Sequence, residues 1–139
     1  MLVEDDESHA LFVERVLQKS GLRNPLVVFK DGQQAVQYLE DSGHMPNGDG
    51  ALPALMLLDL HVPGLSGLMV LSWVRERAAL KHLPVIMLSG STESEDIGRA
   101  FELGADSYLV KPVAFDALID TVASLNLSWV VLGRDAVDG

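Results

Sequence analysis

The chain has 139 residues, with 20 acidic side chains against 10 basic ones, and its net charge of −10 has the wrong sign for binding nucleic acid. No apolar stretch reaches the roughly 18–20 residues of a membrane span, and the acidic start does not resemble a signal peptide, so we expect no membrane partner. The absence of cysteine excludes disulfides and fits a cytoplasmic location.

Short apolar runs alternate with longer runs whose apolar residues recur at helical spacing. The short runs are bounded by turn residues and predict strands buried on both faces, as in a parallel sheet. The longer runs predict helices that cover such a sheet. In chain order the predicted elements are strand 1–3, helix 7–20, strand 26–29, a helix capped by Asp31, strand 54–58, a helix capped by Ser66, strand 85–88, a helix capped by Ser91 or Thr92, strand 107–110 and helix 113–125.

Each predicted helix has an apolar face that we expect to pack on the sheet. Gly21 and Gly104 stand where the first and fourth helices should end, since glycine favours C-terminal caps. Residues 41–53 hold several glycines and prolines and predict the longest loop. The inward faces are expected at Ala10, Val13, Val16, Leu17, Ala35, Val36, Leu39, Val70, Leu71, Val74, Ala78, Ile97, Ala100, Phe101, Phe115, Leu118, Ile119 and Val122.

This alternation predicts an α/β protein of the (βα)5 type, a doubly wound five-stranded parallel sheet with helices on both faces. Crossovers between parallel strands are right-handed, which leaves few ways to wind such a chain. Because the order 2-1-3-4-5 is the commonest for five strands, we expect a flavodoxin-like sheet with that order.

Four of the predicted strands run into polar residues. Glu4 and Asp5 follow the first strand, Asp59 ends the third, Ser89 follows the fourth and Lys111 follows the fifth. Open α/β sheets bind ligands at the edge where their strands end, so we expect these side chains to converge there. The combination of carboxylates, a hydroxyl and an ammonium is typical of a carboxylate that accepts a phosphoryl group.

The clustered acids need a cation. Two carboxylates beside Asp59 repel one another, and a hard divalent ion such as Mg²⁺ relieves this with one or two carboxylates, waters and phosphate oxygens. The ammonium of Lys111 suits a phosphoryl oxygen or a carboxylate, and the Lys111–Pro112 bond is a candidate for the cis form.

Each of these residues also has an ordinary interpretation. Acids after a strand often cap a helix, as we expect of Asp6, and Ser89 can cap the fourth helix. A lysine is usually solvated, and Tyr108 can be a half-buried strand aromatic. Apart from His61, we expect the histidines to lie on the surface: His9, His44 and His82.

The motifs taken together resemble the receiver domain of a bacterial two-component response regulator. The likeness rests on LVEDD at 2–6, LLDLHVPGLSG at 57–67, VIMLSG at 85–90, and Tyr108 three residues before Lys111-Pro112. It implies a receiver domain over 1–127, a short extension over 128–139 and no effector domain. Family members usually have several more residues before the first motif, so we expect that residues before Met1 are missing.

The resemblance also implies roles. Asp59 would accept a phosphoryl group from the phosphohistidine of a histidine kinase. Mg²⁺ would be held by Asp5, Asp59 and the backbone carbonyl of His61, with Glu4 acting through water. Lys111 and Ser89 would hold the phosphoryl oxygens, and Ser89 and Tyr108 would act as the switch. The imidazole of His61 is expected to border the phosphoryl group.

The expected output is a changed surface on the fourth helix, fifth strand and fifth helix, used for partner binding or for a homodimer. The long loop 41–53 and the segment Ser128–Leu132 resemble small stand-alone regulators that partner phytochrome-type or hybrid histidine kinases. A histidine phosphotransfer protein is the other expected partner. The apolar region around Trp129 either supports a dimer or closes the core.

We expect a signalling protein, not an enzyme, that catalyses only its own phosphoryl transfer and dephosphorylation. Two alternatives remain. One is an aspartyl-phosphate hydrolase of the haloacid dehalogenase type, although that chemistry usually places a second acid where His61 stands. The other is a flavodoxin-like cofactor binder, which would want a Gly- or Ser/Thr-rich phosphate loop after the first strand rather than an acidic one.

Overall fold

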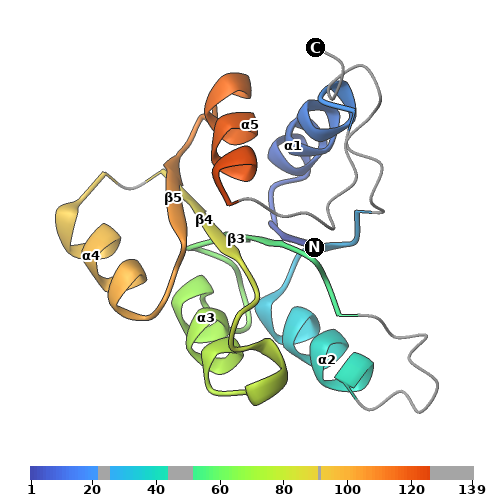
Figure 1. Cartoon of the computed structure of the whole chain (residues 1–139), viewed down its shortest axis with the longest axis vertical. Coiled ribbons are helices and arrows are strands. Elements are labelled where there is room, and N and C mark those ends of the chain that lie inside the picture. The colour runs from blue at the N-terminus through green and yellow to red at the C-terminus, as the bar shows by residue number, and fades with distance from the viewer. Residues whose placement is uncertain (22–25, 44–51, 91, 126–139) are drawn as a thin grey trace.

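The structure is a computed structural model that describes residues 1–21, 26–43, 52–90 and 92–125 (Figure 1). Several predictions concern residues outside these ranges: the cap at Ser91, most of the loop 41–53, the surface position of His44, and the extension 128–139 with Trp129. Among the described residues, no helix has the length and apolar character needed to cross a membrane.

The predicted architecture is confirmed. Five parallel strands form one sheet in the order β2-β1-β3-β4-β5, and helices alternate with them along the chain (Figure 1). The elements are β1 Leu2–Val3, α1 Glu7–Lys19, β2 Val28–Phe29, α2 Gly32–Gly43, β3 Met56–Asp59, α3 Gly67–Arg75, the 3-10 helix η1 Ala78–Leu80, β4 Val85–Ser89, α4 Ser94–Glu102, β5 Ser107–Val110 and α5 Phe115–Ser124.

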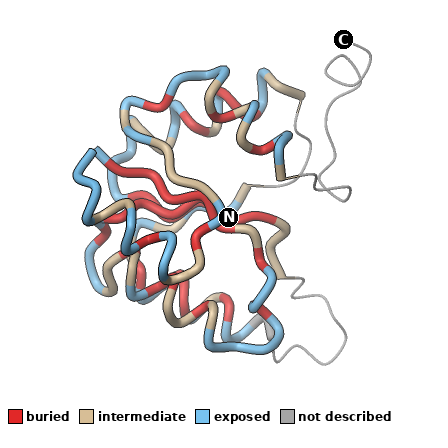
Figure 2. The backbone as a smooth tube through the Cα atoms, turned by 60° about the vertical axis from the view of Figure 1, so that its left-hand side comes forward, coloured by how far each residue is buried: buried red, intermediate tan, exposed pale blue. Residues whose placement is uncertain are grey.

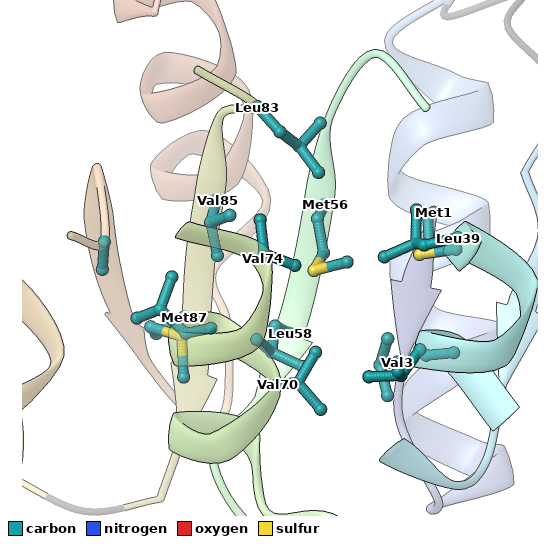
Figure 3. Packing of buried hydrophobic residues seen from close by; sticks show 14 of the residues in the cluster. Met1, Val3, Leu39, Met56, Leu58, Val70, Val74, Leu83, Val85 and Met87 are labelled. Atoms are coloured by element: carbon teal, nitrogen blue, oxygen red, sulfur yellow. The ribbon is translucent and has the colours of Figure 1, made fainter. Parts of the chain in front are cut away.

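Alternate strand residues belong to two separate clusters of buried side chains, as the two-residue period of a strand requires. Figure 2 shows the central strands as buried backbone between the helices. Leu58 and Met87 belong to the cluster under α2 and α3, which Figure 3 shows from close by. Leu57 and Leu88 belong to the cluster under α1 and α5. The central strands are thus covered on both faces, and their polar ends are left as the place where chemistry can occur.

Most helix starts follow the predicted capping. Asp6 Oδ1 accepts hydrogen bonds from Ser8 N and His9 N at 2.9 and 3.1 Å, and Asp31 Oδ1 accepts from Gln33 N at 2.6 Å. The prediction that Thr92 caps α4 is wrong, because Glu93 occupies the N-cap position and makes no side-chain capping bond.

Three apolar residues predicted to face inward are exposed instead. Ala78 lies in η1, because α3 ends at Arg75 and its periodicity does not continue. Phe101 is 48% exposed, since α4 buries only the face that contains Ala100. Phe115 is 41% exposed because it is the first residue of α5, at the end of the buried face. The loop prediction over 41–53 was also too long, since α2 continues to Gly43.

Close backbone packing holds the connection between β3 and α3. Leu60 N donates to Leu88 O and Gly67 N donates to Leu60 O, both at 2.9 Å. A β carbon at Gly67 would lie 2.2 Å from the carbonyl oxygen of Asp59. Only glycine therefore allows α3 to begin directly against the end of β3.

We expect Gly67→Ala to lower the free energy of unfolding by about 1–3 kcal/mol, as overpacking of a tight site does. The matched control is Gly98→Ala on α4, where no atom lies within 4 Å of the added carbon. That change should raise the stability by about 0.5–1 kcal/mol, since alanine favours a helix. Urea denaturation measures both, and a Gly67→Ala protein as stable as the wild type would contradict the packing argument.

Candidate functional site

Asp59 lies at the end of the central strand β3 and is 4% exposed. Backbone pairing carries its neighbours to the same edge of the sheet: Glu4 N donates to Phe29 O at 2.8 Å, and Lys111 N donates to Ser89 O at 2.7 Å. The four predicted strand ends therefore meet at one edge of the sheet, because neighbouring parallel strands end level with one another.

The ammonium of Lys111 bridges two of the acids. Its Nζ atom lies 2.8 Å from Asp59 Oδ2 and 2.6 Å from Glu4 Oε1. Lys111 reaches them from β5, past the end of β4, where the small and fully buried Ser89 stands. The following peptide bond, Lys111–Pro112, is cis.

Three carboxylates outnumber this one ammonium. Glu4, Asp5 and Asp59 each offer an oxygen, and these three atoms lie within 4.8 Å of one another. Glu4 and Asp59 are buried, whereas Asp5 is exposed. A donor set made only of carboxylate oxygens, partly open to solvent, suits a hard divalent cation such as Mg²⁺ or Mn²⁺. The residues present thus fit the predicted metal.

Burial and pairing set the ionisation of the three bridged groups. Burial raises the pKa of Glu4, and the adjoining carboxyl of Asp59 raises it further. Burial also opposes charge on Asp59, but hydrogen bonds with Glu4 and Lys111 prevail and hold the pKa of Asp59 below its ordinary value. Burial likewise opposes charge on Lys111, yet the two carboxylates raise its pKa. Asp59 is therefore the acid held ionised, as a nucleophile must be.

The second oxygen of Asp59 is held by the backbone. His61 N donates to Asp59 Oδ1 at 3.1 Å, and the imidazole of His61 is exposed at the same loop. Both carboxylate oxygens of Asp59 therefore accept a hydrogen bond, one from the ammonium and one from the chain. The roles predicted for the His61 carbonyl and ring stay predictions.

The two predicted switch residues lie on the strands beyond Asp59. Ser89 is the last residue of β4 and is fully buried. Tyr108 lies in β5, is half-buried and packs against the core under α2 and α3. Their positions suit the predicted roles, while the switching itself stays a prediction.

One residue of the site was not expected from the sequence. His9 was predicted to lie on the surface, but its side chain is 13% exposed and its Nδ1 is hydrogen-bonded to Glu4 Oε1. The capping pattern could have predicted this position. Because Asp6 caps α1, the first turn of the helix places His9 next to the end of β1. His82, by contrast, is exposed as predicted.

Comparison with known proteins agrees with this arrangement. A family model described as the response regulator receiver domain matches residues 1–123. The probable methanogenesis regulatory protein FilR2 of Methanothrix harundinacea is 34% identical, over 96% of this chain and 84% of its own length. Response regulator Rcp1 of Synechocystis is 31% identical, over 94% of this chain and 87% of its own length.

Solved structures give the same relation. The bacteriophytochrome response regulator RtBRR superposes with a TM-score of 0.81 and is 37% identical, with 99% of this chain and 86% of RtBRR covered. Rcp1 has been solved in a Mn²⁺-bound form, with a TM-score of 0.75, 31% identity, and 94% and 95% of the two chains covered. The phosphorylated cyanobacterial phytochrome response regulator RcpA also has a TM-score of 0.75, with 29% identity and 94% of each chain covered.

We expect Glu4→Gln to raise the stability of the metal-free protein at neutral pH. A raised pKa means that the folded state binds the Glu4 proton more tightly than the unfolded chain does, so ionised Glu4 destabilises the fold above the ordinary glutamate pKa of about 4.3. The gain should be on the order of 1 kcal/mol at neutral pH, and it should disappear as the pH falls below that value, where both states are protonated.

Urea denaturation in EDTA at several pH values measures this gain. The control is Glu7→Gln, because the hydrogen bond from exposed Lys30 lowers the pKa of Glu7 and that change should bring no gain. A Glu4→Gln protein that is less stable than the wild type at neutral pH would contradict the argument.

Proposed function

The chain belongs to the response regulator receiver family, and from that premise we propose that it is a single-domain response regulator of a phosphorelay. It accepts a phosphoryl group onto Asp59 from the phosphohistidine of a histidine kinase, with Mg²⁺ as the cofactor. It is a signalling protein that catalyses only its own phosphoryl transfer and dephosphorylation. Membership of this family does not favour the dehalogenase-type or flavodoxin-like alternatives.

The observation that carries the proposal is the buried carboxylate of Asp59, which accepts one hydrogen bond from His61 N and one from Lys111 Nζ. In the transfer, a carboxylate oxygen of Asp59 supplies the electron pair for a new P–O bond. The P–N bond breaks in a phosphohistidine that carries a proton on its other ring nitrogen, and the leaving nitrogen keeps the electron pair of that bond, so that neutral imidazole departs. Such a reaction depends on positioning and charge neutralisation more than on covalent help.

We assign the metal to the carboxylates of Asp5 and Asp59 and the backbone carbonyl of His61, with Glu4 acting through water. When bound, the divalent ion supplies positive charge that offsets the carboxylates and the phosphoryl oxygens. The oxygen cluster of Glu4, Asp5 and Asp59 supports this assignment, as does the Mn²⁺-bound form of the relative Rcp1. The phosphorylated form of RcpA supports phosphorylation of the same kind of domain.

After transfer, Lys111 leaves the carboxylates for the phosphoryl oxygens, and Ser89 moves towards them. We propose that the displacement of Ser89 lets Tyr108 turn inward, while His61 borders the phosphoryl group and influences its hydrolysis. Phosphorylation then shifts the balance between two conformations of the surface formed by α4, β5 and α5.

That surface is suited to a partner or to a second copy of the chain. Exposed apolar side chains occur on all three elements, at Phe101, Val110 and Phe115, and exposed apolar groups often mark interfaces. We propose partner binding or dimerisation there, with the Trp129 region of the extension 128–139 contributing and residues 1–127 forming the receiver.

The upstream partner is proposed from the relatives. The likeness to RtBRR favours a phytochrome-type or hybrid histidine kinase, and a histidine phosphotransfer protein would offer the same phosphohistidine chemistry. We propose a cytoplasmic location, where such kinases present their phosphohistidine.

The experiment that tests the proposal is incubation with acetyl phosphate and Mg²⁺, read by intact-protein mass and by size-exclusion chromatography. The wild type should gain one phosphoryl group, and the gain should be lost in EDTA, because the carboxylates are then not neutralised. Asp59→Asn should abolish it, whereas Asp120→Asn, which changes an exposed acid on α5, should not. An earlier elution of the phosphorylated protein would support dimerisation.

Two outcomes would contradict the proposal. A phosphoryl gain on the Asp59→Asn protein would place the acceptor elsewhere. No gain on the wild type in the presence of bound metal would instead indicate a receiver that signals by binding alone.

A further inference from the structure

We propose that His9 is a positioning residue of the metal site, which holds the carboxylate of Glu4 beside Asp5 and Asp59 and so increases the affinity for a divalent cation. The inference rests on the proposed function, since it concerns the same site. His9 does not touch the reacting atoms and acts through Glu4.

The contact between His9 and Glu4 is direct and shielded from water. His9 Nδ1 is hydrogen-bonded to Glu4 Oε1, with side-chain exposures of 13% and 0%. Glu4 has to be ionised to attract a cation, and an ionised carboxylate can only accept, so Nδ1 is the donor in the metal-bound protein. A hydrogen bond that fixes the orientation of a metal-binding group is worth most in such a buried setting.

Two sets of donors hold Glu4, and only one of them is expected to stay in place after phosphorylation. Lys111 Nζ lies 2.6 Å from Glu4 Oε1, but the same ammonium also holds Asp59 and is the group expected to turn to the phosphoryl oxygens. The other donors to Glu4 belong to the segment that follows it. His9 Nδ1 is hydrogen-bonded to Glu4 Oε1, and Asp6 N donates to Glu4 Oε2 at 3.3 Å. His9 therefore keeps Glu4 in place after Lys111 has left.

The ring of His9 is itself well fixed. Its backbone N donates to the capping carboxylate of Asp6 at 3.1 Å, and its ring stacks on Phe12 with centroids 6.3 Å apart and an interplanar angle of 27°. Its Nε2 is buried and has no hydrogen-bond partner within the part of the chain that the structure describes. Within the described residues, the hydrogen bond to Glu4 is therefore the one bond that orients the ring nitrogens of His9.

The test is Mn²⁺ binding, followed by the electron paramagnetic resonance signal of free Mn²⁺ during titration of the unphosphorylated protein. His9→Ala should weaken binding about 10-fold, the lower end of the range for groups that orient metal ligands. His9→Asn should restore most of the affinity, because its amide nitrogen lies close to the place of Nδ1. His9→Gln should not, because its amide corresponds to Nε2. The control is His82→Ala, which removes an exposed histidine and should change nothing.

The outcomes separate the two proposals. If the wild type binds no Mn²⁺, the metal site of the proposed function is wrong. If the wild type binds and His9→Ala binds equally well, the role of His9 is wrong while the proposed function stands. If His9→Asn is as weak as His9→Ala, the effect is one of packing and the inference fails. Should His9→Ala not fold, the comparison of His9→Asn with His9→Gln gives the same decision.

Discussion

The structure depends on a local excess of negative charge at one edge of the sheet. Three carboxylate oxygens lie within 4.8 Å of one another, and a single ammonium, that of Lys111, bridges the two buried acids. Burying a carboxylate without a counter-charge is costly, so a divalent cation bound at this edge would offset the excess charge. In the proposed function, Asp59 is both the nucleophile and, with Asp5, a ligand of the metal.

The fold makes this arrangement possible through its strand order. Placing β1 and β4 on either side of β3 brings Glu4 and Ser89 next to Asp59, and the small side chain of Ser89 lets Lys111 reach inward from β5. Gly67 lets the next helix start against the Asp59 carbonyl, which keeps the loop after β3 short and close. Asp59 therefore lies on a strand that is hydrogen-bonded to a neighbouring strand on each side. A change of charge at Asp59 acts on both of these neighbours.

The fold and most of the site could be predicted because the strands are short apolar runs that end in polar residues. Asp59 and Lys111 were expected to converge for that reason alone. Phe101 and Ala78 were misplaced because apolar spacing does not say where a helix ends or how much of its face the sheet covers. His9 was missed because its role depends on how the first turn of α1 returns to Glu4, a three-dimensional relation that spacing along the chain shows only through the Asp6 cap.

We expect these acids to form one cation site opposite Lys111. Anomalous diffraction from crystals grown with Mn²⁺ tests it most directly, because it locates the ion without reference to activity. We expect one peak at about 2.0–2.6 Å from carboxylate oxygens of Asp5 and Asp59, the range for hard cations, with Glu4 nearby. A structure at saturating Mn²⁺ with no peak there, or with the ion bound away from Asp59, would contradict it.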